Sequence, residues 1–349
     1  MTIRNLEKLL KPKSVALIGA SPKIGSVGHT IGRNLMAGRF DGPIHFVNPK
    51  HRNVDGIACV AHVSDLADTP DLAVIATPPA TVPALAAELE QKGVRAITVV
   101  TAGLDQLQKA AMLEAGRNSC VRVLGPNSIG LLVPPIGLNA SFAHRSATSG
   151  KLAFLSQSGA LATTVIDWAS ERGLGFSHII SLGDMADVDF GDLVDYLAGD
   201  LSCTAILLYI EAITSAPKFM SAVRRAARVK PVVAIKAGRS AAAARAAASH
   251  TGALAGSDLA YSAAFRRAGV LRVGELHDLF AAAEMIGHVP VLPGERLAIL
   301  TNGGGAGVLA TDTLADRGGT LAALSRETIA ALSAVLPANW SHGNPVDII

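Results

Sequence analysis

The chain has 349 residues, of which 50% are hydrophobic and 4% aromatic, and its formal net charge is +3. So small a charge does not indicate a nucleic-acid-binding surface, and so few aromatic residues argue against a platform for stacking bases. The sequence holds no uninterrupted apolar run of about 18 residues, so it predicts no transmembrane helix. A chain of this length predicts two or three globular domains.

The first residues and the cysteines indicate a cytoplasmic protein. The segment Met1–Lys13 mixes charged residues with leucines and lacks the apolar core of a signal peptide. Cys59, Cys120 and Cys203 are scattered and form no Cys-x-x-Cys pair. This pattern fits reduced thiols and argues against a cysteine-based metal site, and we predict no metal-ligand set in this chain.

The first part of the chain alternates short apolar runs with helical stretches. The expected strands are Ser14–Ile18, Ile44–Val47, Leu72–Ala76, Ala96–Val100 and Val121–Leu124. Each run ends in a turn rich in Gly, Pro, Asn or Thr, and spacings near 25 residues leave room for a helix between strands. This pattern predicts an α/β fold with a doubly wound parallel sheet, whose ligands bind beyond the carboxyl ends of the strands.

Two further blocks follow a proline-rich segment, Leu131–Gly150, which we expect to be a loop. The expected strands of the second block are Leu152–Leu155, Ser177–Ser181, Ala205–Tyr209 and Val232–Lys236. A third block opens at Leu297–Thr301. We therefore expect domains at residues 1–146, 147–290 and 291–349. The last is too short for a complete doubly wound domain, so we expect the chain to be a fragment or to pair with another polypeptide.

The first expected turn, Gly19–Gly28, is a glycine-rich loop between a strand and a helix. Backbone N–H groups in such a loop favour phosphate. The loop is not Gly-x-Gly-x-x-Gly, and the second strand ends in Asn48-Pro49-Lys50 rather than in an acid that would hold a nicotinamide-cofactor ribose. The basic end suits a ligand with extra phosphate, such as coenzyme A or NADP. A solvated basic turn is the alternative.

Two more turns have the composition of anion sites. Ser156-Gln157-Ser158-Gly159 follows an expected strand and opens a helix, and Asn302-Gly303-Gly304-Gly305 repeats this design in the third block. Ordinary helix capping is the alternative. Glu211 ends an apolar strand, where a carboxylate can hold one nitrogen of an imidazole, although it can equally be an exposed acid.

His250 lies in a loop of small residues, Ser249–Gly256. Small neighbours leave the ring accessible, and a neutral imidazole is a competent nucleophile for phosphoryl transfer. A capping or core histidine is the alternative.

Together these features resemble the NDP-forming acyl-CoA synthetase family, which includes ADP-forming acetyl-CoA synthetases and, more distantly, succinyl-CoA synthetase. The resemblance covers nearly the whole chain. The ordered motifs that carry it are Gly19–Gly28, Val47–Lys50, Gly125–Asn127, Ser156–Gly159, Tyr209–Glu211, Lys236–Arg239, the His250 loop, Thr301–Gly304 and Asn344–Asp347. It implies a Rossmann-like CoA-binding domain followed by flavodoxin-like domains, the last incomplete.

The resemblance also implies roles for individual residues. His250 is the expected phosphorylated histidine and Glu211 its partner. Ser158, Gly159, Gly303 and Gly304 are the expected phosphate-binding residues. The residues expected to bind coenzyme A are Gly19, Ser21, Gly25, Ser26, Lys50, Thr77, Pro78, Ala102 and Asn127.

In the family, phosphate attacks an acyl-CoA to give an acyl phosphate, and the phosphoryl group passes to histidine and then to ADP. The resemblance implies that an ATP-grasp domain or a β subunit binds ATP or ADP with Mg²⁺, that the substrate is a small carboxylic acid or its acyl-CoA, and that the protein is a homo- or hetero-oligomer. We expect neither nucleic acid nor membrane as a partner. Two alternatives stay open: an acyl-CoA-sensing module of a protein lysine acetyltransferase, and an NADP-dependent dehydrogenase.

Overall fold

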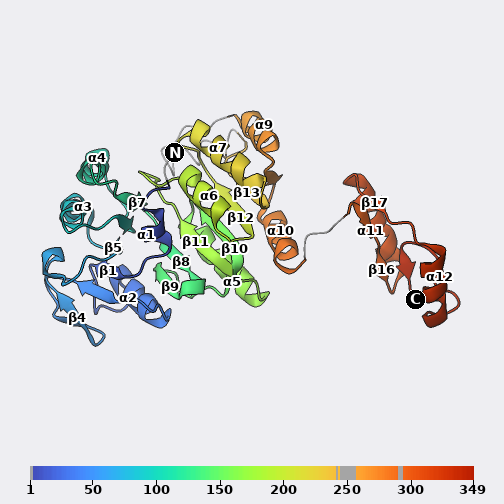
Figure 1. Cartoon of the computed structure of the whole chain (residues 1–349), viewed down its shortest axis with the longest axis horizontal. Helices are drawn as coiled ribbons and strands as arrows, with labels where there is room; N and C mark the ends of the chain where they lie inside the picture. The colour runs from blue at the N-terminus through green and yellow to red at the C-terminus, as the bar shows by residue number, and fades with distance from the viewer. Residues whose placement is uncertain (1–2, 241–242, 244–256, 290–293) are drawn as a thin grey trace. The chain divides into compact units, whose positions relative to one another are not determined.

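A computed structural model of the chain describes residues 3–240, 243, 257–289 and 294–349. The chain divides into two compact units, Met1–His288 and Val289–Ile349 (Figure 1). In the described ranges, no helix combines the length and the apolar character needed to cross a bilayer.

The first sheet has seven strands in the order β3-β4-β2-β1-β5-β6-β7, and only β3 runs antiparallel to its neighbour. Its strands are β1 (Val15–Ile18), β2 (Ile44–Val47), β3 (Asn53–Val54), β4 (Ile57–Val60), β5 (Leu72–Ile75), β6 (Ala96–Val99) and β7 (Arg122–Leu124). Its helices are α1 (Leu6–Leu10), α2 (Val27–Ala37), α3 (Val82–Gln91) and α4 (Gln106–Ala115). The order confirms the predicted doubly wound fold.

The second sheet also has seven strands, in the order β14-β13-β12-β10-β11-β8-β9. Its strands are β8 (Gly130–Val133), β9 (Leu138–Ser141), β10 (Ser149–Ser156), β11 (Phe176–Ser181), β12 (Ala205–Ile210), β13 (Val232–Lys236) and β14 (Leu271–Val273). Its helices are α5 (Gly159–Glu171), α6 (Phe190–Gly199), α7 (Ala216–Ala227), α9 (Asp258–Ala268) and α10 (Leu276–His288). The five strands β10 to β14 are parallel, as a flavodoxin-like fold requires.

The expected loop at Leu131–Gly150 was wrong. Strands β8 and β9 form an antiparallel hairpin there, and β8 pairs with β11 at the edge of the second sheet. Pro134 and Pro135 interrupt the apolar run and form the hairpin turn, so each strand is only four residues long. Both strands are buried, since β8 pairs within the second sheet and β9 packs against α2, where the Asn34 side chain donates to the Ser141 carbonyl at 2.8 Å. They precede the boundary expected at residue 146.

The two sheets of the first unit share one core. A single apolar cluster includes Leu17 of β1, Leu35 of α2, Leu131 of β8 and Leu155 of β10. Since residues from both sheets pack in the same cluster, the sheets are held in a defined relation.

A buried ion pair also joins the sheets. The Arg122 guanidinium of β7 lies 3.0 Å from a carboxylate oxygen of Asp187 and 3.0 Å from one of Asp192, which belongs to α6. Lys218 of α7 pairs with Asp192 at 2.7 Å. Breaking a buried pair leaves an uncompensated charge, so the loss of either partner of Arg122 is costly.

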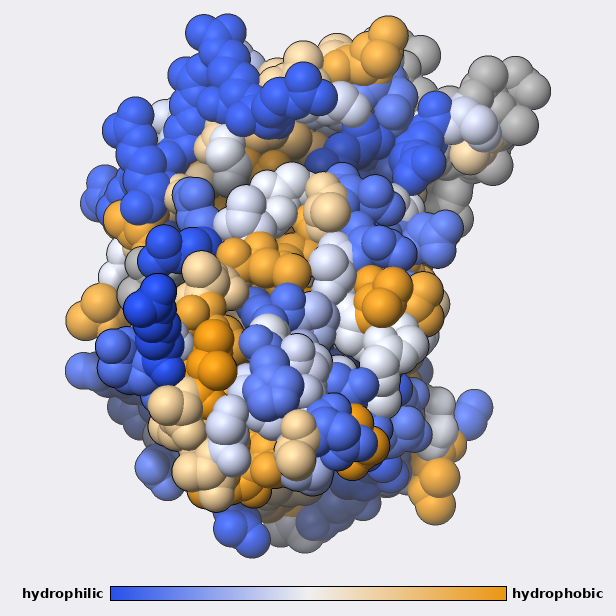
Figure 2. All heavy atoms as spheres, turned by 90° about the vertical axis from the view of Figure 1, so that its right-hand side faces the viewer, coloured by the Kyte–Doolittle hydropathy of each residue, from blue (hydrophilic) through white to orange (hydrophobic). Residues whose placement is uncertain are grey.

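The second unit contains two parallel strand pairs and two helices. The expected strand Leu297–Thr301 is divided into β15 (Arg296–Leu297), which pairs with β17 (Thr320–Leu321), and β16 (Leu300–Thr301), which pairs with β18 (Val346–Asp347). The helices are α11 (Gly304–Asp316) and α12 (Arg326–Val335). Several large apolar side chains of this unit are exposed, and Figure 2 shows hydrophobic residues on the surface of the face it presents. They include Leu300, Val308, Leu309 and Val335.

Candidate functional site

Each large sheet has one switch point, where the connections that leave two neighbouring strands run to opposite sides of the sheet. In the first sheet, β1 is flanked by β2 and β5; in the second, β10 is flanked by β11 and β12. Open α/β sheets bind ligands at the carboxyl ends of the strands at such a point. The motifs predicted from the sequence follow these strands directly.

The glycine-rich loop after β1 is compact. Gly19 has a φ of +97°, and a Cβ added to Gly28 would lie 2.0 Å from the Gly19 carbonyl oxygen. The start of α2 therefore lies directly against the loop, an approach that only glycine permits. Ser26 caps α2, since its Oγ accepts the N–H of His29 at 3.3 Å. Gly25, with a φ of +81°, completes the loop.

The basic turn after β2 is tied to this loop. The Asn48 side-chain nitrogen donates to the Ala20 carbonyl at 2.7 Å, and its oxygen accepts the N–H of Lys50 at 2.8 Å. Lys50 is exposed. Asn48 therefore places an exposed cation beside the glycine loop, as a phosphate-bearing ligand requires.

The turns after β5, β6 and β7 are linked to one another. Thr101 Oγ1 donates to the Thr77 carbonyl at 2.7 Å, and the N–H of Asn127 donates to the Thr101 carbonyl at 2.9 Å. Asn127 has a left-handed φ of +57°, and its side chain donates to Asp184 at 3.1 Å. These bonds fix three successive strand ends in one row.

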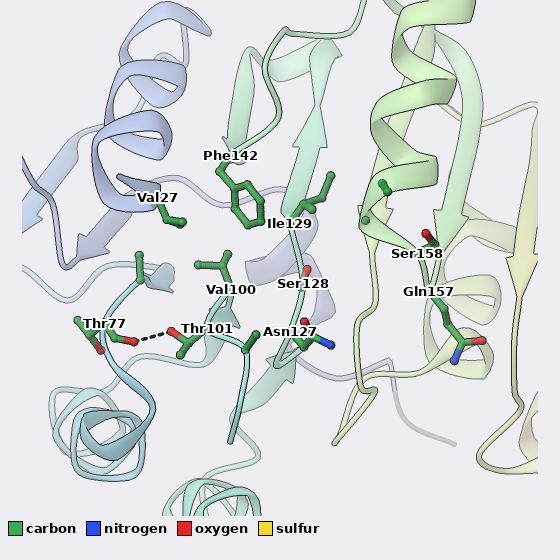
Figure 3. Close-up of a pocket in the computed structure, with 14 residues that line it drawn as sticks. Val27, Thr77, Val100, Thr101, Asn127, Ser128, Ile129, Phe142, Gln157 and Ser158 are labelled. Atoms are coloured by element: carbon green, nitrogen blue, oxygen red, sulfur yellow. Dashed lines mark hydrogen bonds between the residues drawn. The ribbon is translucent and has the colours of Figure 1, made fainter. Parts of the chain in front are cut away.

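A cavity of about 500 Å³ joins this row to the second sheet (Figure 3). Of the residues proposed to bind coenzyme A or phosphate, those that line it are Thr77, Ala102, Asn127, Ser158 and Gly159. Gly19, Ser21, Gly25, Ser26, Lys50 and Pro78 do not line it. The volume lies within the roughly 300–1,000 Å³ typical of small-molecule sites.

The start of α5 forms the wall of the cavity on the side of the second sheet. Ser158 is its N-cap, and its Oγ accepts the Leu161 N–H at 3.3 Å. In the part of the chain that the structure describes, the N–H groups of Gly159 and Ala160 have no hydrogen-bond partner, and both residues line the cavity. Free N–H groups at the start of a 13-residue helix favour an anion.

Glu211 lies next to this helix start, at the end of β12. The Gln157 side-chain oxygen accepts the N–H of Glu211 at 2.6 Å and that of Ala212 at 2.8 Å. Gln157 itself lines the cavity, so one side chain connects the cavity with the residue after β12. Burial, and then the charge of Glu211, raise the pKa of the neighbouring Tyr209.

Lys236 opens the motif Lys236–Arg239, but it is not among the residues predicted from the sequence to bind or react. It ends β13, opposite Ile210 of β12, and its side chain is only 3% exposed. Its ammonium lies 4.7 Å from the centre of the Tyr261 ring and bonds to the Ala237 carbonyl. Burial lowers the pKa of Lys236, while the charges of Asp258 and Glu211 oppose this. The position of this lysine directly after four apolar strand residues could have indicated its burial.

The turn before α11 repeats the turn before α5. In the first unit, Ser156 Oγ donates to the Ser158 carbonyl at 2.7 Å and accepts the Ser158 N–H at 3.1 Å. In the second, Thr301 Oγ1 makes the same two bonds with Gly303, at 2.9 and 3.1 Å. The two helix starts therefore share one local design, with Gly304 as the first helical residue of α11.

His250, the expected nucleophile, and its loop Ser249–Gly256 lie outside the described residues. That Ser158 and Gly303 face a common phosphate also stays a prediction, because these residues belong to different units.

Comparisons with known proteins match the chain in two segments. Residues 13–134 match the model of a CoA binding domain, and residues 149–286 match that of a succinyl-CoA ligase like flavodoxin domain.

Relatives match over nearly the whole chain. The acetate–CoA ligase [ADP-forming] I of Archaeoglobus fulgidus is 41% identical over 99% of the chain. The acetate–CoA ligase [ADP-forming] I subunit alpha of Pyrococcus furiosus is 38% identical, and the chain covers 76% of it. The chain spans about half the length of the Archaeoglobus relative (50%).

A solved structure is also similar over nearly the whole chain. It is acetyl-coenzyme A synthetase 1 of Ca. Korarchaeum cryptofilum, described as dinucleotide forming and in complex with phosphate and ADP. Its TM-score is 0.94 at 37% identity, and the match covers 98% of this chain and 75% of that one.

Proposed function

Since the chain belongs to the family of ADP-forming acetate–CoA ligases, we propose that it is the CoA-binding and phosphohistidine portion of an acyl-CoA synthetase. The reaction is the reversible conversion of acyl-CoA, ADP and phosphate into a carboxylic acid, CoA and ATP. The observation that carries the proposal is that one cavity is lined both by the strand ends of the CoA-binding sheet and by Gly159 and Ala160, whose N–H groups are free.

The first sheet holds coenzyme A in this proposal. The glycine loop and Lys50 contact its phosphate groups, because the loop offers backbone N–H groups and Lys50 a free positive charge. Thr77, Ala102 and Asn127 line the path along which the pantetheine arm brings the thioester to Ser158.

The chemistry takes place at the start of α5. A phosphate oxygen, held by the N–H groups of Gly159 and Ala160, attacks the thioester carbonyl. The C–S bond breaks, CoA leaves as the thiol, and an acyl phosphate forms. A nitrogen of His250 then attacks phosphorus, the bond from phosphorus to the acyl oxygen breaks, and the carboxylic acid leaves.

Glu211 holds the proton on the other ring nitrogen and so orients the imidazole. Gly303 and Gly304 supply the second anion-binding helix start. An ATP-grasp domain or β subunit binds the nucleotide, and Mg²⁺ there neutralises phosphate charge. We propose that the protein acts as an oligomer in the cytoplasm.

The steps from acyl-CoA and phosphate to phosphohistidine need no nucleotide, so they can be tested with this chain alone. We expect that incubation with acetyl-CoA and ³²P-phosphate releases free CoA and labels the protein with acid-labile, base-stable phosphate. The His250→Ala variant should remain unlabelled while still binding CoA. The matched control is His288→Ala, which removes an exposed histidine outside the cavity and should be labelled like the wild type.

The outcomes separate the alternatives. Label retained in His250→Ala would overturn the assignment of the nucleophile. Binding of acyl-CoA with no label in the wild type would instead favour a sensor module of an acetyltransferase.

A further inference from the structure

The side chains around the cavity fall into two groups. Polar residues, Thr77, Thr101, Asn127, Gln157 and Ser158, form one row, and apolar residues gather beside them (Figure 3). The apolar wall, as we call it, consists of Val27, Ile129 and Phe142, which come from three separate segments of the chain. Phe142 lies between the other two in Figure 3.

The apolar wall adjoins the predicted phosphate site. A Cβ added to Gly159 would lie 2.5 Å from Ile129 Cγ2, so the Ile129 side chain contacts the first turn of α5. The Phe142 N–H donates to the Ile129 carbonyl at 3.0 Å, which fixes the two residues relative to each other. Val27 follows Ser26, the cap of α2, on the side of the CoA loop. The wall therefore extends from the CoA loop to the phosphate site.

The described side chains that form this surface carry no formal charge. Of the fourteen residues that line the cavity within the described ranges, none is Asp, Glu, Lys, Arg or His. A second carboxylate on an acyl chain would lose water here without gaining a cation, which is costly. An apolar chain would instead cover the three hydrophobic side chains and gain from leaving water.

We propose that the apolar wall is the acyl subsite and that it selects uncharged acyl groups longer than acetyl, while excluding dicarboxylic ones. The assignment rests on the proposed function, because it takes the thioester to lie beside Gly159. A single methyl group contacts only part of a wall built from a valine, an isoleucine and a phenylalanine. Each added methylene that fits a hydrophobic pocket can be worth about tenfold or more in discrimination.

Direct binding to the full 349-residue chain tests the assignment without catalysis. Isothermal titration compares CoA, acetyl-CoA, butyryl-CoA and succinyl-CoA. We expect butyryl-CoA to bind at least about tenfold more tightly than acetyl-CoA, and succinyl-CoA to bind no more tightly than CoA. Equal affinity for butyryl-CoA and succinyl-CoA would overturn the acyl subsite alone. Failure of CoA itself to bind would overturn the proposed function and the subsite with it.

Variants of the wall locate the effect. Val27 is 41% exposed, so Val27→Ala should fold normally and should remove much of the preference for butyryl-CoA over acetyl-CoA. Val27→Lys should shift the preference toward succinyl-CoA, because it supplies the missing cation. The matched control is Val229→Ala, an exposed valine outside the cavity, which should leave all four affinities unchanged. An unaltered preference in both Val27 variants would contradict the proposal.

Discussion

The side-chain oxygen of Gln157 accepts the backbone N–H of Glu211 at 2.6 Å, and thereby joins the turn after β10 to the turn after β12. The same oxygen accepts the Ala212 N–H at 2.8 Å. These strands are neighbours at the switch point of the second sheet. Gln157 thus places the proposed partner of His250 relative to the start of α5, so it is a positioning residue.

Replacing Gln157 by leucine should destabilise the protein and slow histidine labelling. Two partly buried N–H groups lose their acceptor, which costs about 1–3 kcal/mol for an unsatisfied donor. Urea unfolding measures the stability, and the ³²P-phosphate assay measures the labelling rate.

The conservative variant Gln157→Glu separates stability from chemistry. It keeps an acceptor oxygen, so its unfolding free energy should stay near that of the wild type. Its added negative charge beside the phosphate path should still slow labelling. An unfolding free energy unchanged in Gln157→Leu would show that the two bonds do not hold this turn.

Removing the Lys50 charge should weaken CoA binding by about tenfold or more, which corresponds to one charge-assisted contact. The affinity of the wild type should also fall with salt, and that of Lys50→Ala should fall less. Titration calorimetry at two ionic strengths measures both effects. Lys151→Ala is the control, because Lys151 is exposed at the opposite end of β10. Identical affinities for CoA in the Lys50 and Lys151 variants would contradict the assignment of Lys50 to a CoA phosphate group.

Much of this arrangement was predictable because strand ends carry recognisable turns. The turns after β1, β2, β5 and β10 were all identified from Gly, Pro, Asn and Ser residues following short apolar runs. Local chemistry of this kind depends on neighbouring residues only, so it can be read from sequence.

What the sequence did not reveal depends on contacts between distant segments. Phe142 reads as an ordinary hydrophobic residue, and only the pairing of the β8–β9 hairpin with the edge of the second sheet brings it to the cavity. Gln157 reads as a polar turn residue, and its role depends on Glu211, 54 positions away. The burial of Lys236 was not predicted, because it depends on Tyr261, whose ring packs against the lysine side chain from a distant part of the sequence.

Adding a methyl group to Gly28 should abolish CoA binding. Its Cβ would lie 2.0 Å from the Gly19 carbonyl oxygen, so α2 and the glycine loop must move apart. We expect Gly28→Ala to lose at least about 1–3 kcal/mol of stability, as overpacked sites do. Gly294→Ala is the control, since a Cβ there meets no atom within 4 Å and the residue has no proposed role in binding. Normal CoA binding by Gly28→Ala would contradict the close approach of loop and helix.

His178 should make the stability of the first unit depend on pH. Its ring is 1% exposed, and its Nε2 lies 3.8 Å from the Asp200 carboxylate, too far for a hydrogen bond. Burial lowers the pKa of His178 from 6.5 to about 4, with Lys11 and Lys230 acting in the same direction and Asp200 opposing them.

The sign follows from comparing the folded and unfolded chains. Below pH 6.5 the unfolded chain takes up a proton on this histidine while the folded chain does not, so acid favours unfolding. The unfolding free energy should therefore fall as the pH drops from 6.5 to about 4, by about 3 kcal/mol at roughly 1.4 kcal/mol per pH unit. Above pH 6.5 this group should contribute no slope.

Urea unfolding at several pH values measures this slope in the wild type and in His178→Asn, which cannot take up the proton. We expect the variant to lose most of the dependence between pH 6.5 and 4, whereas His288→Asn, at an exposed histidine, should retain it. Bonds from Ser202 and Lys11 lower the pKa of Asp200 against the effect of its burial. Asp200 therefore adds to the loss of stability only below about pH 3.8, where its carboxylate takes up a proton in the unfolded chain. The same slope in His178→Asn as in the wild type would mean that the buried histidine is not the group that titrates.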